Sequence, residues 1–406
     1  MKKLHLLLLF VGVLTVVQSQ PRIENCKVFP SDNIWNTPVT NAPVHARSSS
    51  YINTIGADLS LRNDFGSGLW NGAPIGIPYV LVGANTPKQR ITFDYADESD
   101  TVGYPVPANP PIEGGNNSTG DRHILIVDTN TCTLYELYHA FYKTDQWTAG
   151  SGAVFDLASN KLRPDTWTSA DAAGLPILPG LVRYDEVAAG AINHMIRFTV
   201  SKTSKAYLWP ARHYASSITD PAYPPMGIVM RLKSSFDTAT LKPQARVIAR
   251  ALMTYGMILA DNGSAWYMSG VPDDRWDMDD LYTLRQIHGR DFDAVDLSSF
   301  MLDISSAKVR TTTNVEEREY ISTAVRIGDD VVEINDPSIL RALQDYDVKL
   351  YDQRGNIIPH TNINVTILDN KTVVATNHIA PGLYVIQRSE EHTSELQSRQ
   401  YLVCRL

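Results

Sequence analysis

The segment STGDRHILIVDTNTCTLYELYHAF (residues 118–141) places acids and histidines inside two runs that otherwise have the pattern of β-strands. The apolar runs on either side of Thr129-Asn130 predict a hairpin in which paired residues share one face of the sheet. If those two residues form the turn, His123 pairs with Glu136 and Asp121 pairs with Tyr138. An acid, an imidazole and a phenol would then meet at the outer end of a face that begins apolar, which is an arrangement suited to acid–base catalysis.

We therefore expect Glu136 to act as nucleophile or base, with Asp121 or Glu113 as its partner acid and with His123 and Tyr138 as further catalytic groups. Two carboxyl groups are sufficient to cleave a glycosidic bond. Apolar neighbours would raise the pKa of Glu136, whereas a cationic His123 would lower it, so the sequence leaves its protonation open. The alternative is an exposed cross-strand ion pair without a catalytic role.

Aromatic and polar side chains elsewhere are candidates for substrate binding, because flat rings beside hydrogen-bonding groups suit the faces and rims of sugars. An arginine would neutralise a uronate if the enzyme were a lyase. The Pro-rich stretch 159–187 is predicted to form a cleft wall or lid, since long loops are uncommon unless they bind something; a plain covering loop is the alternative, as core packing is for the rings and histidines. The predicted substrate-binding residues are Trp167, Arg183, His194, Trp209, Arg212 and His213.

No cofactor is predicted and no metal ligand is assigned. The acidic runs 94–100 and 272–280 lack the spacing of an EF-hand loop, so solvated loops or helix caps are favoured over calcium. Four histidines (His123, His139, His194 and His213) could join carboxylates in a metal site, but their spacing is not diagnostic. The chain contains no GxSxG, HExxH or CxxC motif and no phosphate-binding loop.

The elements around these residues predict a mainly β protein. Short extended runs with few helices favour a β-sandwich or jelly-roll-like main domain over residues 20–304, with a few helices at its edge. Helices are predicted over 242–263, beginning at Pro243 and ending at Asn262-Gly263, and over 277–289. Cys26 and Cys132 are expected to form a disulfide, which closes a loop of roughly 105 residues and contributes about 4 to 5 kcal/mol in the chain-entropy model.

The N-terminus resembles a secretory signal peptide. Two lysines precede an apolar run from Leu6 to Val17, and small residues suit cleavage after Ser19. We expect a secreted or cell-surface protein without a membrane span, because no later apolar run is long enough to cross a bilayer. The net charge of −8 becomes −10 without the two leader lysines, which disfavours a nucleic-acid partner.

The composition changes near residue 300, and residues 305–319 are predicted to be a linker to a small Ig-like β-sandwich over 320–387. The phrases VKLYDQRGNII (348–358) and APGLYVIQ (380–387) resemble the C-terminal sorting domain of the Bacteroidetes type IX secretion system. The resemblance implies an outer-membrane secretion machinery as partner and no chemistry. Residues 388–406, with RSEEHTSELQS followed by YLVCRL, resemble a translated sequencing adapter and are excluded from the fold prediction.

These patterns together favour a secreted carbohydrate-active enzyme that acts on an extracellular polysaccharide. A glycoside hydrolase using paired carboxyl groups is preferred, with a polysaccharide lyase as a variant. The alternatives are a non-catalytic glycan-binding or cell-surface protein and a metal-dependent secreted hydrolase. Loss of turnover on removal of a single acid would separate catalysis from binding.

Overall fold

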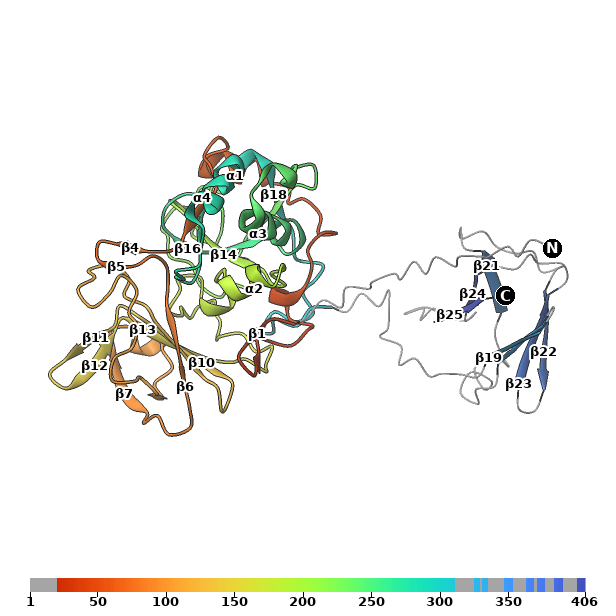
Figure 1. The fold of residues 1–406 in the computed structure, drawn as a ribbon, viewed down its shortest axis with the longest axis horizontal. Helices are drawn as coiled ribbons and strands as arrows, with labels where there is room; N and C mark the ends of the chain where they lie inside the picture. Colours follow the sequence, from red (N-terminus) through yellow and green to blue (C-terminus); the bar gives the residue numbers. More distant parts are fainter. Residues whose placement is uncertain are drawn as a thin grey trace, which may run out of the picture. The chain divides into compact units, whose positions relative to one another are not determined.

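The computed structural model describes residues 20–310 in full and, beyond them, only the backbone of seven strands (Figure 1). The chain divides into two units, Met1–Thr311 and Thr312–Leu406. The predicted signal peptide and most of the predicted linker lie outside the described residues. Among the residues that the structure describes, no helix is both long enough and apolar enough to cross a membrane.

The first unit is mainly β, as predicted. Its helices are α1 (Ser48–Ile55), α2 (Tyr184–Ala188), α3 (Pro243–Thr254) and α4 (Met278–Leu281). Its strands are β1 (Arg22–Ile23), β2 (Cys26–Lys27), β3 (Arg62–Asp64), β4 (Leu69–Trp70), β5 (Ala73–Pro74), β6 (Tyr79–Val82), β7 (Gln89–Phe93), β8 (Gly103–Tyr104), β9 (Ile124–Asp128), β10 (Thr133–Tyr138), β11 (Phe141–Lys143), β12 (Gln146–Ala149), β13 (Ser151–Asp156), β14 (Ile196–Val200), β15 (Val229–Leu232), β16 (Met257–Asn262), β17 (Tyr267–Ser269) and β18 (Phe292–Val295).

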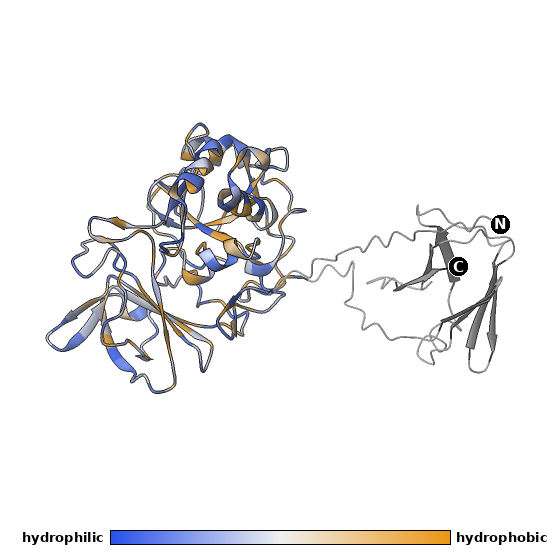
Figure 2. Ribbon diagram, in the orientation of Figure 1, coloured by the Kyte–Doolittle hydropathy of each residue, from blue (hydrophilic) through white to orange (hydrophobic). Residues whose placement is uncertain are grey.

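Three larger sheets organise these strands. Their orders are β13-β10-β9-β6, β11-β12-β7-β8 and β18-β15-β16-β14-β17-β3. Ile124 and Ile126 of β9 belong to a small core that also includes Phe93 and Trp147, from the second sheet, whereas Leu125 and Val127 belong to the large core of the six-stranded sheet. Since successive side chains of a strand point to opposite faces, β9 and β10 separate two cores and are buried on both sides. Figure 2 accordingly shows hydrophobic residues spread over many short elements.

The β9–β10 hairpin differs from the predicted one in its register. Leu134 pairs with Val127 and Glu136 pairs with Leu125, so the predicted pairing of Glu136 with His123 is wrong by two residues. The connection is longer than a two-residue turn, because Cys132 has a φ of 51° and belongs to the loop. A shift of two residues preserves the face of each side chain. His123 and Glu136 therefore still point to the same side of the sheet.

The disulfide between Cys26 and Cys132 is present, and the two positions are 106 residues apart in the sequence. It joins strand β2 near the N-terminus of the described chain to the loop between β9 and β10. The predicted bond is confirmed. It anchors the inner end of the hairpin whose outer end carries Asp121 and His123.

The helix predicted over 242–263 ends earlier than its pattern suggested. Helix α3 stops at Thr254, and Gly256 follows with a φ of 72°, a conformation that glycine adopts without steric cost. A Cβ at Gly256 would lie 2.9 Å from the backbone oxygen of Met230. Residues 257–262 form β16 in the middle of the six-stranded sheet. The predicted helix over 277–289 is found as α4 and a short 3-10 helix, with the Asp277 carboxylate capping its start.

The second unit contains the seven strands described by their backbone alone. They are β19 (Val325–Gly328), β20 (Val331–Ile334), β21 (Asp347–Asp352), β22 (Ile363–Leu368), β23 (Lys371–Thr376), β24 (Leu383–Ser389) and β25 (Gln400–Arg405). They form two antiparallel sheets, β19-β20-β23-β22 and β21-β24-β25. Strand β25 falls in the segment that resembles a translated adapter.

Candidate functional site

Three of the four predicted catalytic residues lie near one another. The His123 ring lies 5.7 Å from the Tyr138 ring, measured between centroids, and Asp121 offers a carboxylate oxygen within 4.8 Å of His123 and Glu113. Asp121 is exposed, Tyr138 is half-buried and His123 is buried. The outer end of the hairpin therefore combines an acid, an imidazole and a phenol as predicted, although not through the predicted pairing.

Glu136 is sealed from solvent, so its predicted place at the mouth of a cleft is wrong. Its side chain is 0% exposed, and its carboxylate accepts hydrogen bonds of 2.9–3.0 Å from the backbone N–H groups of Ile177 and Leu178. Burial raises the pKa of Glu136 to about 7, against the lowering effect of those two N–H groups. We conclude that Glu136 has a structural role, because its carboxylate holds the 177–178 segment against the sheet. A catalytic role is excluded, because no substrate can reach a side chain that is fully buried.

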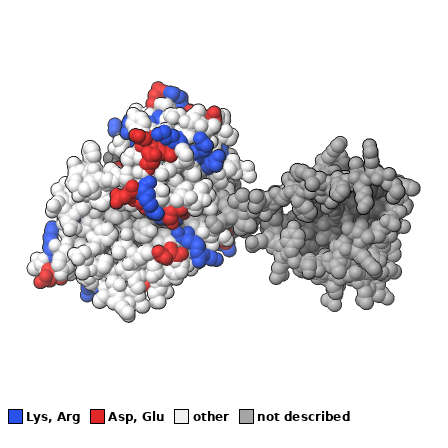
Figure 3. Space-filling view, viewed as in Figure 1, with Lys and Arg blue, Asp and Glu red and all other residues white. Residues whose placement is uncertain are grey.

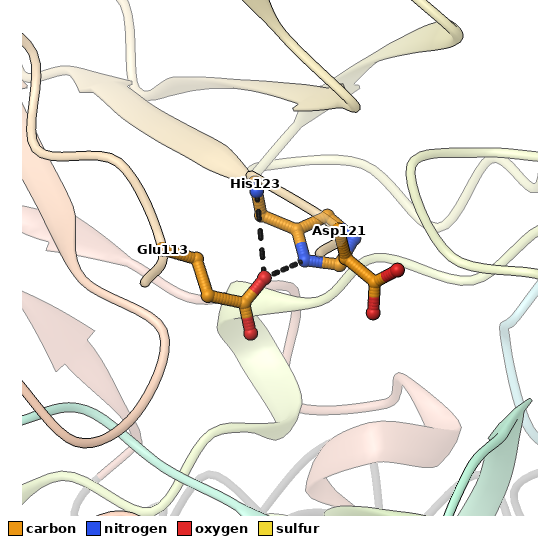
Figure 4. Close-up of side chains that lie close together, drawn as sticks. All are labelled: Glu113, Asp121 and His123. Atoms are coloured by element: carbon orange, nitrogen blue, oxygen red, sulfur yellow. Dashed lines mark hydrogen bonds and ion pairs between the residues drawn. The ribbon is translucent and has the colours of Figure 1, made fainter. Parts of the chain in front are cut away.

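The closest contact at the hairpin end joins His123 to Glu113, which belongs to the loop before β9 (Figure 4). The Nδ1 atom of His123 lies 2.5 Å from Oε2 of Glu113, and its Nε2 atom lies 3.0 Å from the backbone oxygen of Ala170. Both partners are acceptors, so the ring donates from both nitrogens as an imidazolium. Burial lowers the pKa of His123, but the charge and hydrogen bond of Glu113 outweigh it and raise the pKa to about 9.

Arg197 of β14 forms the base of the same region. Its guanidinium binds the fully buried Asp171 through two hydrogen bonds of 2.6 and 2.8 Å, and Nη1 donates to the Ser269 hydroxyl. A bidentate pair of this kind is among the strongest charged contacts in proteins. Although burial opposes the charged form, the Asp171 carboxylate raises the pKa of Arg197 well above its ordinary value, so the guanidinium stays charged.

Further carboxyl groups surround these two cations, and we call Asp64, Glu113, Asp121 and Asp261 the acidic cluster. The side chain of Asp261, from β16, is 23% exposed, and one oxygen lies 3.5 Å from Nη2 of Arg197. Burial and the charge of Asp171 raise the pKa of Asp261 to about 7. Asp64, at the end of β3, has its pKa raised by desolvation and by the charges of Glu113 and Asp121.

Glu113 differs from Asp261 in its protonation. Burial opposes its charged form, but the charge and hydrogen bonds of His123 lower its pKa below the ordinary value. Near neutral pH the cluster therefore holds one carboxyl group that is partly protonated and one that is ionised. Separated pKa values of this kind distinguish a proton donor from a base or nucleophile.

The predicted substrate-binding residues do not join the acidic cluster. Arg212 is buried and donates to the backbone oxygens of Arg163 and Ile304, so it is not free to neutralise a uronate. The His213 Nδ1 atom lies 2.8 Å from the backbone oxygen of Ala172, and Trp209 donates to the backbone oxygen of Ser306. These groups have structural partners.

The remaining three predicted binding residues are also engaged within the protein. The half-buried Trp167 ring lies 5.6 Å from the Arg163 guanidinium. His194 and Arg183 are both buried and both contact the carboxylate of Glu186. Two nitrogens of Arg183, Nε and Nη1, have no hydrogen-bond partner. Neither residue opens toward the acidic cluster.

The 159–187 segment is not a lid, since nearly all of its residues between 169 and 183 are buried. It runs between the β9–β10 sheet and the six-stranded sheet, where Ala170 bonds His123, Asp171 bonds Arg197 and Ile177 bonds Glu136. The segment therefore fixes the positions of the polar groups beneath the acidic cluster. The sequence of this segment lacks hydrophobic periodicity because the segment is buried without forming a regular helix or strand over most of its length.

The acidic cluster also contains a group of residues that could bind a metal ion. Glu113, Asp121 and His123 each offer one ligand atom, all within 4.8 Å of one another. Both nitrogens of His123 are nevertheless engaged, one by Glu113 and one by Ala170. A metal would have to displace the proton between His123 and Glu113, so the arrangement favours a hydrogen-bonded pair.

Sequence reasoning missed the roles of Arg197, Asp171 and Asp261. Arg197 and Asp261 each interrupt an apolar strand, and a charged residue inside such a run signals a buried pair. Asp261 was hidden because its strand was assigned to the preceding helix. Asp64 ends a short strand whose partner, β17, lies about 200 residues away along the chain, and nothing local indicates its position.

The described part of the chain shows no patch of a single charge on the face drawn in Figure 3. On the face seen in Figure 3, acidic and basic side chains are intermixed. A hollow of about 270 Å³ lined by Thr40, Lys233 and Asp293 contains none of the predicted site residues. No family model, no curated protein and no solved structure matches this chain.

Proposed function

We propose that the chain is a secreted hydrolase of glycosidic bonds that uses the carboxyl groups of the acidic cluster. The observation that carries the proposal is the contrast between Asp261 and Glu113. Both carboxyl groups interact with the charges of Arg197 and His123. The pKa of Asp261 is nevertheless raised to about 7, whereas the pKa of Glu113 is lowered. A protonated and an ionised carboxyl group that act within one site are the pair that glycoside cleavage needs.

In this mechanism Asp261 donates its proton to the glycosidic oxygen as the bond to the sugar breaks. The ionised Glu113 stabilises the positive charge that develops on the sugar ring, either by direct attack or by taking a proton from the attacking water. His123 is a positioning residue, because its two hydrogen bonds fix Glu113 relative to Ala170. Arg197 is paired with Asp171 and limits the net negative charge of the cluster.

The substrate class follows from the charge of the cluster. Its four carboxyl groups outnumber the two neighbouring cations, and Arg197 is already paired with Asp171. A uronate or sulfate group would meet repulsion there. We therefore favour neutral polysaccharides and set aside the lyase variant, whose arginine is engaged elsewhere.

Export remains part of the proposal. The N-terminal leader pattern and the resemblance of residues 320–387 to a type IX sorting domain both support secretion or attachment at the cell surface. A disulfide supports the same interpretation, because such bonds persist outside a reducing cytoplasm.

The test is release of reducing ends from neutral polysaccharides by the full-length chain and by Asp261→Asn. We expect the variant to lose about 100- to 10,000-fold in kcat/KM. Asp145→Asn is the matched control, because Asp145 is an exposed acid in the β11–β12 turn with a φ of 60° that asparagine also tolerates.

The pH profile gives a second check. Activity of the unmodified chain should fall on the alkaline side with an apparent pKa near 7, as Asp261 loses its proton. Equal turnover in Asp261→Asn and in the control, or a profile without that alkaline limb, would contradict the assignment. Binding without turnover in every variant would support a glycan-binding protein.

A further inference from the structure

We propose that Trp70, at the tip of the β4–β5 hairpin, is a stacking platform that binds a sugar ring of the polysaccharide beside the acidic cluster. The inference rests on the proposed function, since it names a binding subsite for the same substrate. It stands on the exposure of Trp70, on the rigidity of its hairpin and on the place where that hairpin is anchored.

Trp70 is 72% exposed, and its neighbour Leu69 is 66% exposed. Exposing an indole to this degree forgoes the free energy that burying a large ring would provide. The other tryptophans of the described chain are buried or half-buried. A solvated tryptophan in a protein that buries its other indoles points to a partner that covers the ring.

The hairpin that carries the ring is short and well defined. Trp70 pairs with Ala73, and the two residues between them, Asn71 and Gly72, have φ values of 51° and 81°. Two successive residues with positive φ form the tight turn that best matches the twist of a two-stranded ribbon. The ring is therefore presented from a fixed backbone, which lowers the entropy lost on binding.

The strand that pairs with Trp70 packs against the loop that carries Glu113. Directly paired residues of a hairpin share one face, so Trp70 lies on the same face as Ala73. Ala73 is 5% exposed, and a Cβ added to Gly115 would lie 3.3 Å from the Ala73 side chain. Because Gly115 is two residues from Glu113, the hairpin that carries Trp70 packs, through Ala73, against the loop that supplies the ionised acid.

The base of the hairpin is anchored next to residues of the site. Asp64 ends strand β3, and the backbone then turns into the hairpin, where Gly66 donates to the backbone oxygen of Ile75. Ile77 donates to the backbone oxygen of Gly270, the residue after Ser269, which is hydrogen-bonded to Arg197. The hairpin thus connects the base of the cluster with its edge.

A sugar is the occupant that fits these features. The C–H face of a pyranose stacks on an indole, while its hydroxyl groups suit hydrogen-bonding groups such as carboxylates. An apolar protein surface would make favourable contacts with the indole and with Leu69 but not with the acids.

The experiment is affinity electrophoresis of the full-length chain in gels containing mixed-linkage β-glucan, arabinoxylan or galactomannan. Trp70→Ala should weaken retention about tenfold on the polysaccharide that retains the unmodified chain, and Trp70→Phe should recover part of the loss. Tyr282→Ala, which removes a ring that is 59% exposed elsewhere, should migrate as the unmodified chain does. Oligosaccharide binding should also shift the tryptophan emission of the unmodified chain and not that of Trp70→Phe.

The outcomes separate the platform from the catalytic proposal. Asp261→Asn should still be retained, because it keeps the ring while losing turnover. Retention of Trp70→Ala equal to that of the Tyr282→Ala control overturns the platform and leaves the hydrolase intact. Weakened retention together with full activity of Asp261→Asn supports the platform and overturns the acid assignment. Absence of retention of the unmodified chain on all three polysaccharides overturns the platform.

Discussion

Two histidine–glutamate pairs in this molecule are nearly identical in local chemistry and differ in their surroundings. His123 bonds Glu113 and the backbone oxygen of Ala170, and His194 bonds Glu186 and the backbone oxygen of Met195. Both rings are buried, at 2% and 1% exposure. Each therefore has a carboxylate on one nitrogen and a carbonyl on the other.

The difference lies in what surrounds the carboxylate. Glu186 is 11% exposed and also receives a hydrogen bond from the buried Arg183, so its charge is compensated within the core. Glu113 is 25% exposed and faces Asp64 and Asp121. The comparison shows that a buried histidine hydrogen-bonded to an acid does not by itself indicate a catalytic site. Solvent access and uncompensated neighbouring charge separate the two pairs.

The largest effect that tests this contrast is on activity. Glu113→Gln should reduce hydrolysis by about 100- to 10,000-fold, because it removes the ionised carboxylate without changing the side-chain shape. Glu186→Gln should lower stability while the folded fraction keeps its specific activity. Reducing-end assays normalised to folded protein by circular dichroism would check both, and equal losses in the two variants would erase the distinction between the pairs.

A second prediction concerns the arginines that support the two pairs. Arg197→Gln should lower the free energy of unfolding by about 3 to 5 kcal/mol, since it leaves the buried Asp171 carboxylate without its charged partner. Arg183→Gln should cost less, about 1 to 3 kcal/mol, because Nε and Nη1 of Arg183 have no hydrogen-bond partner to lose. Urea unfolding measures both values. A larger cost for Arg183→Gln would show that the Arg183–Glu186 contact, and not the Arg197–Asp171 contact, contributes more to stability.

The sequence predicted part of this picture. The disulfide, the mainly β fold and the shared face of His123 and Glu136 follow from local pattern, and a register error of two residues leaves faces unchanged. The burial of Glu136 could not be predicted, because the segment that covers it lies about 40 residues further along the chain. Asp261 was missed for a related reason: the strand that carries it follows α3 without a polar break, and one glycine marks the boundary.

A smaller effect should appear in the dependence of stability on pH. The pKa of His123 is raised to about 9 from an unfolded value near 6.5, so its stabilisation is complete below about pH 6.5 and is lost as the pH rises through 9. Unfolding free energy should therefore fall on the order of 1 to 3 kcal/mol between pH 6 and 10. His123→Asn should flatten this change in urea titrations at those two pH values. An unchanged slope in the variant would assign the titration to another group.

The smallest expected effect is that of metal removal, and it concerns the pair that faces solvent. The trio of Glu113, Asp121 and His123 has the spacing of a metal site, and a metal-dependent hydrolase would lose activity in EDTA. We expect no change in activity or in the unfolding midpoint, because His123 uses Nδ1 to hold Glu113 and Nε2 to hold Ala170, which leaves no lone pair for a metal. Elemental analysis after dialysis should find less than one equivalent of any transition metal. Stoichiometric zinc or manganese that is lost in Asp121→Asn would contradict this expectation. It would mean that a metal ion, and not a proton, joins His123 to Glu113, and that the two histidine–glutamate pairs differ in their chemistry.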